Sequence, residues 1–334
     1  MNSPSRITLE YNEKIRPQPD RENAFARASG GDEVRQSQLF LLYYYGIQVT
    51  YPPKCPPINQ ELRKLSERFG LLHPGARNAS NYAPHNAAWR IKIASALKLK
   101  HYPLMQYRHA DKCAARLAID FAPHDLGPDG LDHMHIAIKS IVDGGWVAFV
   151  ELGKVNMIEV TVDLHGVPMG GFHVLPQQTT TVKSWSNAGK LETLYLGKKQ
   201  GNFTRIYDRG KKRASKKQAW AHGHVTRVER VLKGQAIPVA SLASLDNVFA
   251  GIKMVDLPPT APPEGKGYIW DLFCDAVAQR GLPSALKLLK SEEYRKNYRK
   301  WLAQHPRPWW QPEEIWAEWG ATIEKTRLAS KDWF

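Results

Sequence analysis

Hydrophobic and polar residues alternate over several segments in the middle of the chain. Between 157 and 165, apolar residues at 158, 160, 162 and 164 alternate with Glu159, Thr161, Asp163 and His165. Because successive side chains of a strand point to opposite faces, this pattern predicts a strand with one buried and one polar face. Further strands are expected at 116–122, 146–151, 171–184, 192–197, 202–208 and 224–233.

Helical spacing of apolar residues predicts the elements on either side of these strands. We expect helices at 33–45, 58–72, 85–98 and 128–142, and a helical region from 268 onward. That last region holds seven of the eleven tryptophans, and Trp316 and Trp319 are expected in its core because large aromatic residues on helices are usually buried. A helix set among antiparallel strands is typical of an α+β fold.

Composition shifts divide the chain into four parts. Residues 1–110 are expected to form an accessory region, an arm followed by helices, with a possible role in DNA binding. Residues 111–257 form the α+β core, and a Pro/Gly-rich stretch at 258–267 is the linker to the helical region 268–334.

The longest apolar stretch, 39–47, is far shorter than the ~20 residues that span a bilayer. The N-terminal residues have no apolar segment of the kind found in secretory signals. The three cysteines are far apart, which argues against a disulfide framework. We therefore expect a soluble cytoplasmic protein, in the host cytoplasm if a phage encodes it, with no membrane partner.

Positive charge is concentrated in one window of the chain. The formal net charge is +15, and residues 183–233 alone contain fourteen basic and three acidic residues. Clustered lysines and arginines are the electrostatic signature of a protein that binds phosphate backbones. A nucleic acid is therefore the expected partner.

A tyrosine flanked by arginines lies inside this window. In the strand predicted at 202–208, alternation puts Arg205, Tyr207 and Arg209 on one face, and it pairs Arg227 with Glu229 on a later strand. Arginines hold phosphate oxygens, carboxylates hold Mg²⁺ or Mn²⁺, and a tyrosine can attack phosphorus to form a phosphotyrosine. Acids and arginines on a strand can equally form cross-strand ion pairs.

Spacing limits the carboxylates that can share a metal ion. Glu159 and Asp163 are four residues apart, or about 13 Å along a strand, which is too far for one ion. We therefore pair Glu159 with Glu229 across strands and keep Asp163 as a weaker candidate ligand.

At these segments the chain resembles rolling-circle replication initiators, of the filamentous-phage gene II type and related plasmid proteins. The resemblance rests on the order of four motifs and covers roughly 113–255. The motifs are Ile158-Glu-Val-Thr-Val-Asp163, Thr193-Leu-Tyr-Leu-Gly197, Arg205-Ile-Tyr-Asp-Arg-Gly-Lys211 and Thr226-Arg-Val-Glu229, preceded by Arg116-Leu-Ala-Ile-Asp-Phe-Ala122.

The resemblance implies a metal-dependent endonuclease with an antiparallel-sheet core of the ferredoxin or RRM type. Tyr207 would become linked to the 5′ phosphate at a replication origin, and the freed 3′ hydroxyl would prime a host polymerase, with a host helicase as further partner. Glu159 and Glu229 match the acidic positions, although Glu159 stands where the family more often has Asp. Lys211 matches a lysine after the tyrosine, but it lies four residues away.

The basic residues around this tyrosine are the expected DNA contacts. They are Arg205, Arg209, Lys212, Arg213, Lys198, Lys199 and Arg227. Whether a second nucleophile rejoins the strand, and whether the protein oligomerises, stays open.

Three alternatives remain. His133 and His135 form a His-apolar-His motif that binds metal in another branch of these nucleases, but their predicted helix points residues two apart in different directions. Tyr195 is a second candidate nucleophile, without flanking arginines. The whole chain could also be a non-catalytic single-stranded DNA- or RNA-binding protein, for which a buried Tyr207 hydroxyl would argue.

Overall fold

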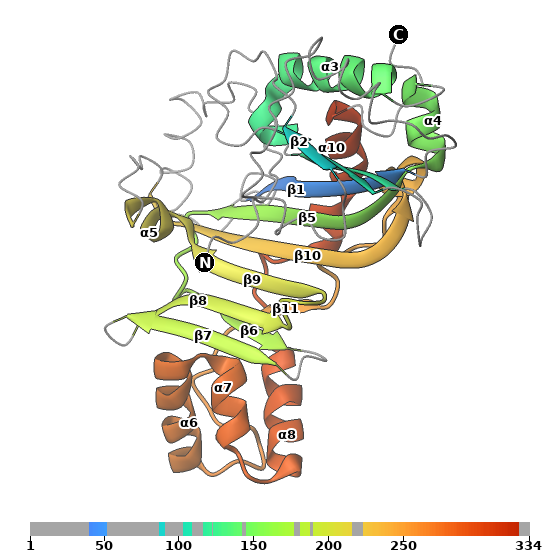
Figure 1. Cartoon of the computed structure of the whole chain (residues 1–334). Coiled ribbons are helices and arrows are strands. Elements are labelled where there is room, and N and C mark those ends of the chain that lie inside the picture. Colours follow the sequence, from blue (N-terminus) through green and yellow to red (C-terminus); the bar gives the residue numbers. More distant parts are fainter. Residues whose placement is uncertain are drawn as a thin grey trace.

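The computed structural model of the chain is built on one large antiparallel sheet (Figure 1). The residues it describes are 40–51, 87–90, 103–108, 116–121, 123–141, 145–176, 181–187, 190–215 and 223–326. The strand order is β2-β3-β4-β1-β5-β10-β9-β8-β7, and every neighbouring pair is antiparallel. The strands are β1 (Phe40–Tyr51), β2 (Ala87–Arg90), β3 (Leu104–Arg108), β4 (Arg116–Phe121), β5 (Lys154–His165), β7 (Val182–Asn187), β8 (Lys190–Gly197), β9 (Phe203–Asp208) and β10 (Val225–Pro238).

The middle of the sheet is buried on both faces. Ile158, Val160, Val162 and Leu164 of β5 are fully buried, which confirms the predicted apolar face. This face packs against α3 (Pro123–Ile141), α4 (Gly145–Leu152) and the last helices of the chain. The opposite, polar face of β5 is also buried, so its charged side chains require partners within the protein.

The segment 146–151, predicted as a strand, is instead part of the helix α4. Trp146, Phe149 and Val150 are buried while Val147 is 45% exposed, which is helical rather than alternating periodicity. A short apolar run fits a buried strand and a buried helix equally well, and here packing against α3 decides for the helix.

The helices predicted at 33–45 and 85–98 are wrong where the structure describes them. Residues 40–51 form β1, which pairs with β4 and β5 inside the sheet, and residues 87–90 form β2. The run of leucines and tyrosines from 41 to 45 followed by Val-Thr-Tyr has the β-branched and aromatic content of a strand. The helix predicted at 58–72 lies outside the described residues.

The remaining central elements differ from the prediction in two places. The strand expected at 171–184 divides into β6 (His173–Pro176) and β7, and β6 forms a separate two-stranded sheet with β11 (Ile252–Val255). The basic stretch expected as a turn begins with the short helix α5 (Arg209–Ala214). Asp208 caps α5, because its carboxylate accepts a hydrogen bond of 2.9 Å from the Lys211 backbone amide.

The C-terminal helices belong to two different cores. The helices α6 (Gly267–Arg280), α7 (Leu282–Leu288) and α8 (Glu292–Ala303) form their own cluster beyond β7 and β8 (Figure 1). The helices α9 (Pro312–Ala317) and α10 (Trp319–Thr326) return to the main core beside the 3₁₀ helix η3 (Val239–Ser244).

Two tryptophan side chains hold α9 and α10 against the main core. The Trp319 indole, fully buried as predicted, donates a 2.7 Å hydrogen bond to the Leu242 carbonyl. Trp316 stacks on it at 4.8 Å and donates to the Leu245 carbonyl. The fold is thus α+β with an antiparallel sheet and C-terminal helices, and no described helix is long and apolar enough to cross a membrane.

Candidate active site on the polar face of the sheet

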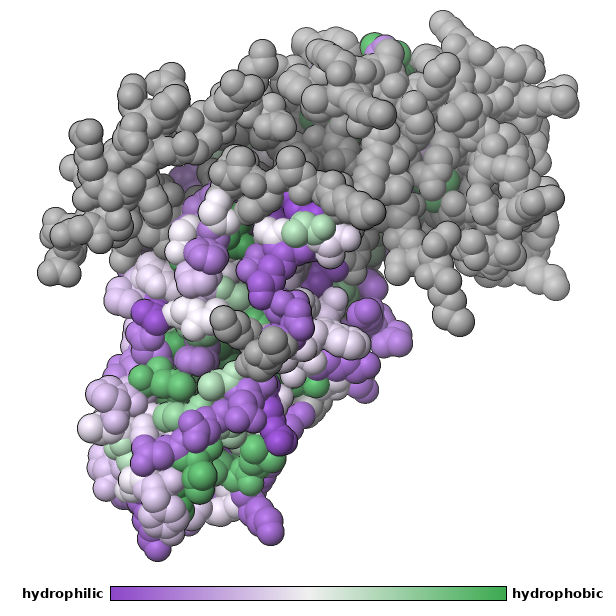
Figure 2. All heavy atoms as spheres, turned by 90° about the vertical axis from the view of Figure 1, so that its left-hand side faces the viewer, coloured by the Kyte–Doolittle hydropathy of each residue, from purple (hydrophilic) through white to green (hydrophobic). Residues whose placement is uncertain are grey.

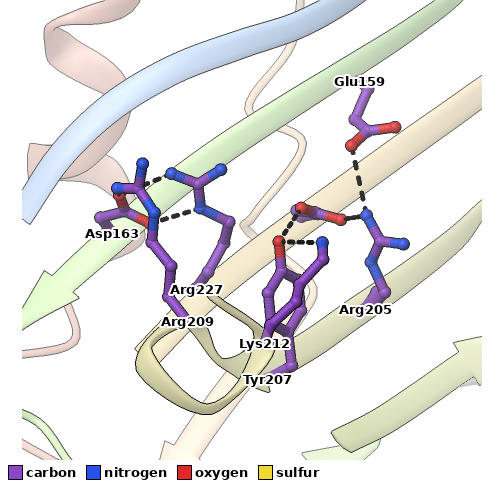
Figure 3. A network of polar contacts seen from close by, with 8 residues as sticks. Glu159, Asp163, Arg205, Tyr207, Arg209, Lys212 and Arg227 are labelled. Atoms are coloured by element: carbon purple, nitrogen blue, oxygen red, sulfur yellow. Dashed lines mark hydrogen bonds and ion pairs between the residues drawn. The ribbon is translucent and has the colours of Figure 1, made fainter. Parts of the chain in front are cut away.

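Strand register brings the predicted site residues together on one face of the sheet. In β10, Arg227 lies opposite Asp163 of β5 on one side and opposite Tyr207 of β9 on the other. Glu229 lies opposite Arg205 in the same way. Because opposed residues of antiparallel strands share a face, the five side chains form a single layer, drawn in Figure 3.

Asp163 is the centre of a closed ion cluster. Its side chain is fully buried, and its two oxygens accept hydrogen bonds of 2.6 and 2.7 Å from Arg227. Arg209, the first residue of α5, forms a further ion pair with the same carboxylate. Burial alone would raise the pKa of Asp163, but the Arg227 and Arg209 guanidiniums hold that pKa below its ordinary value. Both oxygens of Asp163 are therefore already bound by guanidinium groups.

Tyr207 lies next to this cluster in a different setting. Its hydroxyl donates a 2.5 Å hydrogen bond to Glu229 Oε1 and accepts one of 2.8 Å from Lys212 Nζ. The Lys212 ammonium also lies 4.1 Å from the centre of the ring, and the Arg205 guanidinium lies 5.1 Å from it. A phenol between a carboxylate and an ammonium has both a proton acceptor and a cation in place.

Burial raises the pKa of the Tyr207 phenol above its ordinary value near 10. Arg227 and Arg209 act in the opposite direction, and the carboxylates of Asp163 and Glu159 add to the increase. Tyr207 is therefore protonated at neutral pH. A nucleophilic role requires that a neighbour remove its proton, and Glu229 is the group that holds it.

Glu159 and Glu229 converge on one cation, the Arg205 guanidinium. Arg205 Nη2 is 3.5 Å from Glu159 Oε1 and forms an ion pair with Glu229 Oε2 (Figure 3). The two carboxylates thus contact one cation, the Arg205 guanidinium, although register places Glu159 opposite Val231 and Glu229 opposite Thr161. Among the described residues, no group of three or more His, Cys, Asp and Glu side chains is placed to hold a metal ion.

A pocket of about 300 Å³ opens beside Tyr207. Its walls come from β8, β9 and α5, and they include Tyr195, Arg205, Tyr207, Lys211 and Lys212. Lys211 points away from the tyrosine hydroxyl and forms an exposed ion pair of 2.8 Å with Glu192. The lysine at the hydroxyl is therefore Lys212, and Lys211 lies at the rim.

Hydrophilic side chains gather on the face of the molecule that carries α5, and hydrophobic patches lie lower, over α6 (Figure 2). Lys198 and Lys199 are exposed in the turn between β8 and β9, and Arg213 is half-buried at the end of α5. Lys199 contacts the Tyr195 ring in the pocket wall, and none of the three belongs to the buried layer.

Of the alternative site residues, the two histidines lie on α3 and Tyr195 lies in the pocket wall. His133 and His135 are on the helix α3, as predicted, with His133 exposed and His135 buried against the Trp146 ring at 4.2 Å. Burial and the nearby Lys139 lower the pKa of His135 to about 4. Tyr195 is opposite Arg205 in β8 and lines the same pocket as Tyr207, with its ring 5.2 Å from the Lys199 ammonium.

Tyr207 and its charged neighbours are enclosed by the protein. Tyr207 is only 3% exposed, and Glu159, Arg205, Arg227 and Glu229 are all buried. The hydroxyl nevertheless lies in a polar setting, since both of its contacts are with charged groups. Burial of Tyr207 is thus the observation that the sequence analysis expected of the non-catalytic alternative.

Sequence patterns did not reveal which lysine forms a hydrogen bond with the Tyr207 hydroxyl, or which arginines form ion pairs with Asp163. Lys212 lies five residues beyond Tyr207, and it returns to the ring only because Asp208 caps α5 and turns the chain. The aspartate directly after the tyrosine, followed by a basic run, was the signal for that cap.

No protein-family model matches the chain, and no curated protein matches it. Solved structures do give a match. The fold is similar to that of a rolling circle replication initiator. That protein comes from Geobacillus stearothermophilus; the match has a TM-score of 0.35 and 11% identity, and it covers 73% of this chain and 99% of that one. The roles of the site residues rest on the geometry described above.

Proposed function

We propose that the chain initiates rolling-circle replication of a phage or plasmid by nicking one DNA strand through Tyr207. The observation that carries this proposal is the Tyr207 hydroxyl, held between the Glu229 carboxylate and the Lys212 ammonium at the wall of a basic pocket. A general base, a nucleophile and a charge-stabilising cation are the parts that such a reaction needs.

The reaction starts with the transfer of the phenol proton to Glu229. As the Tyr207 oxygen attacks phosphorus, a phosphotyrosine bond forms and the bond from phosphorus to the 3′ oxygen breaks. The leaving oxygen takes up a proton, which the protonated Glu229 supplies. Lys212 stabilises the negative charge on the phenol oxygen, because its ammonium contacts that atom directly. The products are a protein-linked 5′ phosphate and a free 3′ hydroxyl that a host polymerase extends.

Glu159 and Glu229 are the residues that would hold a divalent Mg²⁺ or Mn²⁺ ion, since both carboxylates already contact one cation. Glu229 would do so through Oε2, the oxygen paired with Arg205, while Oε1 keeps its contact with the Tyr207 hydroxyl. When bound, such an ion polarises the phosphodiester. It would compete with Arg205 for the same two carboxylates. Asp163 is left out of this ligand set, because Arg227 and Arg209 hold its oxygens.

A second candidate function is non-catalytic binding of single-stranded DNA or RNA. The burial of Tyr207 and the Arg205 bridge between two carboxylates favour it, since both are also features of a purely structural network. This alternative predicts salt-sensitive binding without cleavage.

The deciding assay uses a supercoiled plasmid that carries the replicon's origin, Mg²⁺ and the purified protein. Wild type should produce nicked circles and a covalent protein–DNA adduct, and Tyr207→Phe should produce neither. Tyr195→Phe is the matched control, because Tyr195 lines the same pocket without the carboxylate contact. An adduct formed by Tyr207→Phe would overturn the proposal.

A further inference from the structure

We propose that the sheet carries a track for single-stranded DNA from Tyr207 to the edge strand β7, where Trp185 stacks on a base. The inference rests on the proposed nicking of one strand, and it adds the position and chemistry of a substrate contact. It follows from the register of three strands, the exposure of one indole ring and the charge around it.

Register places Trp185 on the same face of the sheet as Tyr207. Thr193 of β8 lies opposite Tyr207 on one side and opposite Trp185 on the other. In the next row, Tyr195 lies between Arg205 and Lys183 in the same way. Two strand spacings separate Tyr207 from Trp185, which is roughly 10 Å, or the rise of about three stacked nucleotides.

Trp185 is unusual for its exposure. Its side chain is 63% exposed. Trp146, Trp270, Trp310 and Trp319 are each at most 6% exposed. β7 is the last strand of the described sheet (Figure 1), so no further described strand lies beyond Trp185. An indole held on a strand next to open solvent is a platform for a flat partner.

Charge identifies the partner as a polyanion. Lys183 is exposed one row away from Trp185, and Lys198 and Lys199 are exposed in the adjoining turn. Of the two acidic side chains that line the pocket, Glu192 is paired with Lys211 and Asp208 caps α5. Aromatic rings alternating with lysines bind single strands, because the rings stack on bases and the ammonium groups contact phosphates. The bases of a duplex already stack on each other, so this surface suits an unpaired strand.

The test measures binding of a fluorescent oligonucleotide of the nicked strand by anisotropy. Trp185→Ala should weaken binding about tenfold, as expected for loss of one stacked base, and Trp185→Phe should restore most of it. Tyr268→Ala is the matched control, because Tyr268 is 62% exposed on α6 and away from the track. Its affinity should stay within about twofold of wild type. Lys183→Gln should lower the slope of log Kd against log salt by about 0.7.

Equal binding by Trp185→Ala and wild type would overturn the track, even if Tyr207 still forms its adduct. Conversely, weaker binding by Trp185→Ala in a protein that never forms an adduct would support the track while refuting the nicking reaction. An equal loss in Trp185→Ala and Tyr268→Ala would show a general effect of exposed aromatic residues, and it would also overturn the assignment.

Discussion

Two clusters on one sheet face use the same kinds of residue for different ends. Asp163 with Arg227 and Arg209 is closed, since both carboxylate oxygens are bound by guanidiniums and the side chain is fully buried. In the neighbouring cluster, Glu229 shares its carboxylate between Arg205 and the Tyr207 hydroxyl, and that hydroxyl lines a pocket.

The difference shows what separates a structural ion cluster from a reactive one. The Asp163 carboxylate is bound by guanidinium groups, which stay protonated at ordinary pH, so no proton is transferred between them. Glu229 meets a group that carries a transferable proton, beside an ammonium that can stabilise the charge left behind. We therefore propose that the Asp163 cluster stabilises the fold and that the Tyr207 cluster carries out the reaction.

The largest expected effect is that of Glu229→Gln on nicking. An amide cannot accept the phenol proton as a base, so the rate should fall about 10²–10⁴-fold, measured as nicked plasmid over time. Asp163→Asn, assayed at a temperature where it is folded, should lower the rate less than about tenfold. Equal losses in the two variants would remove the distinction between the clusters.

Asp163→Ala should lower the free energy of unfolding by about 3–5 kcal/mol near neutral pH, because it leaves Arg227 and Arg209 buried without their counter-ion. Urea titrations followed by circular dichroism measure this loss. The pKa of Asp163 is lower in the folded chain than the unfolded value near 3.9. Its contribution is therefore complete above about pH 5 and fades as pH falls through the lower, folded value. A loss that does not shrink in acid would contradict the ion-pair explanation.

A smaller contrast separates two adjacent lysines. Lys212→Met removes a charged hydrogen bond to the tyrosine oxygen, which should slow nicking roughly 10–100-fold. Lys211→Met breaks only an exposed ion pair with Glu192, where the lysine side chain is 50% exposed, so its effect should be about fivefold or less. The reverse order would return the catalytic role to Lys211, as the resemblance to initiators implied.

Sequence patterns predicted the middle of the fold well. Strict alternation in β5, β9 and β10 is typical of a strand alone. It therefore predicted directly which face of the sheet carries Glu159, Tyr207 and Glu229. Register did not follow, because alternation fixes the face of a residue but not its cross-strand neighbour. The Arg205 bridge and the bidentate Arg227 contact therefore emerged only from the structure.

Unbroken apolar runs were the places where prediction failed. Residues 40–45 and 146–151 were assigned to the wrong class, because an unbroken apolar run shows neither the helical nor the strand period. Their environment decides the outcome: β1 is enclosed between β4 and β5, whereas α4 packs against α3.

Mapping the covalent linkage shows directly whether Tyr207 is the nucleophile. Wild-type protein is incubated with Mg²⁺ and an oligonucleotide that contains the nick site, the adduct is digested with protease and nuclease, and the modified peptide is sequenced by mass spectrometry. We predict a nucleotide linked through its 5′ phosphate to Tyr207, within the peptide that spans β9. Linkage to Tyr195 or another residue, or cleavage without any linkage, would contradict it.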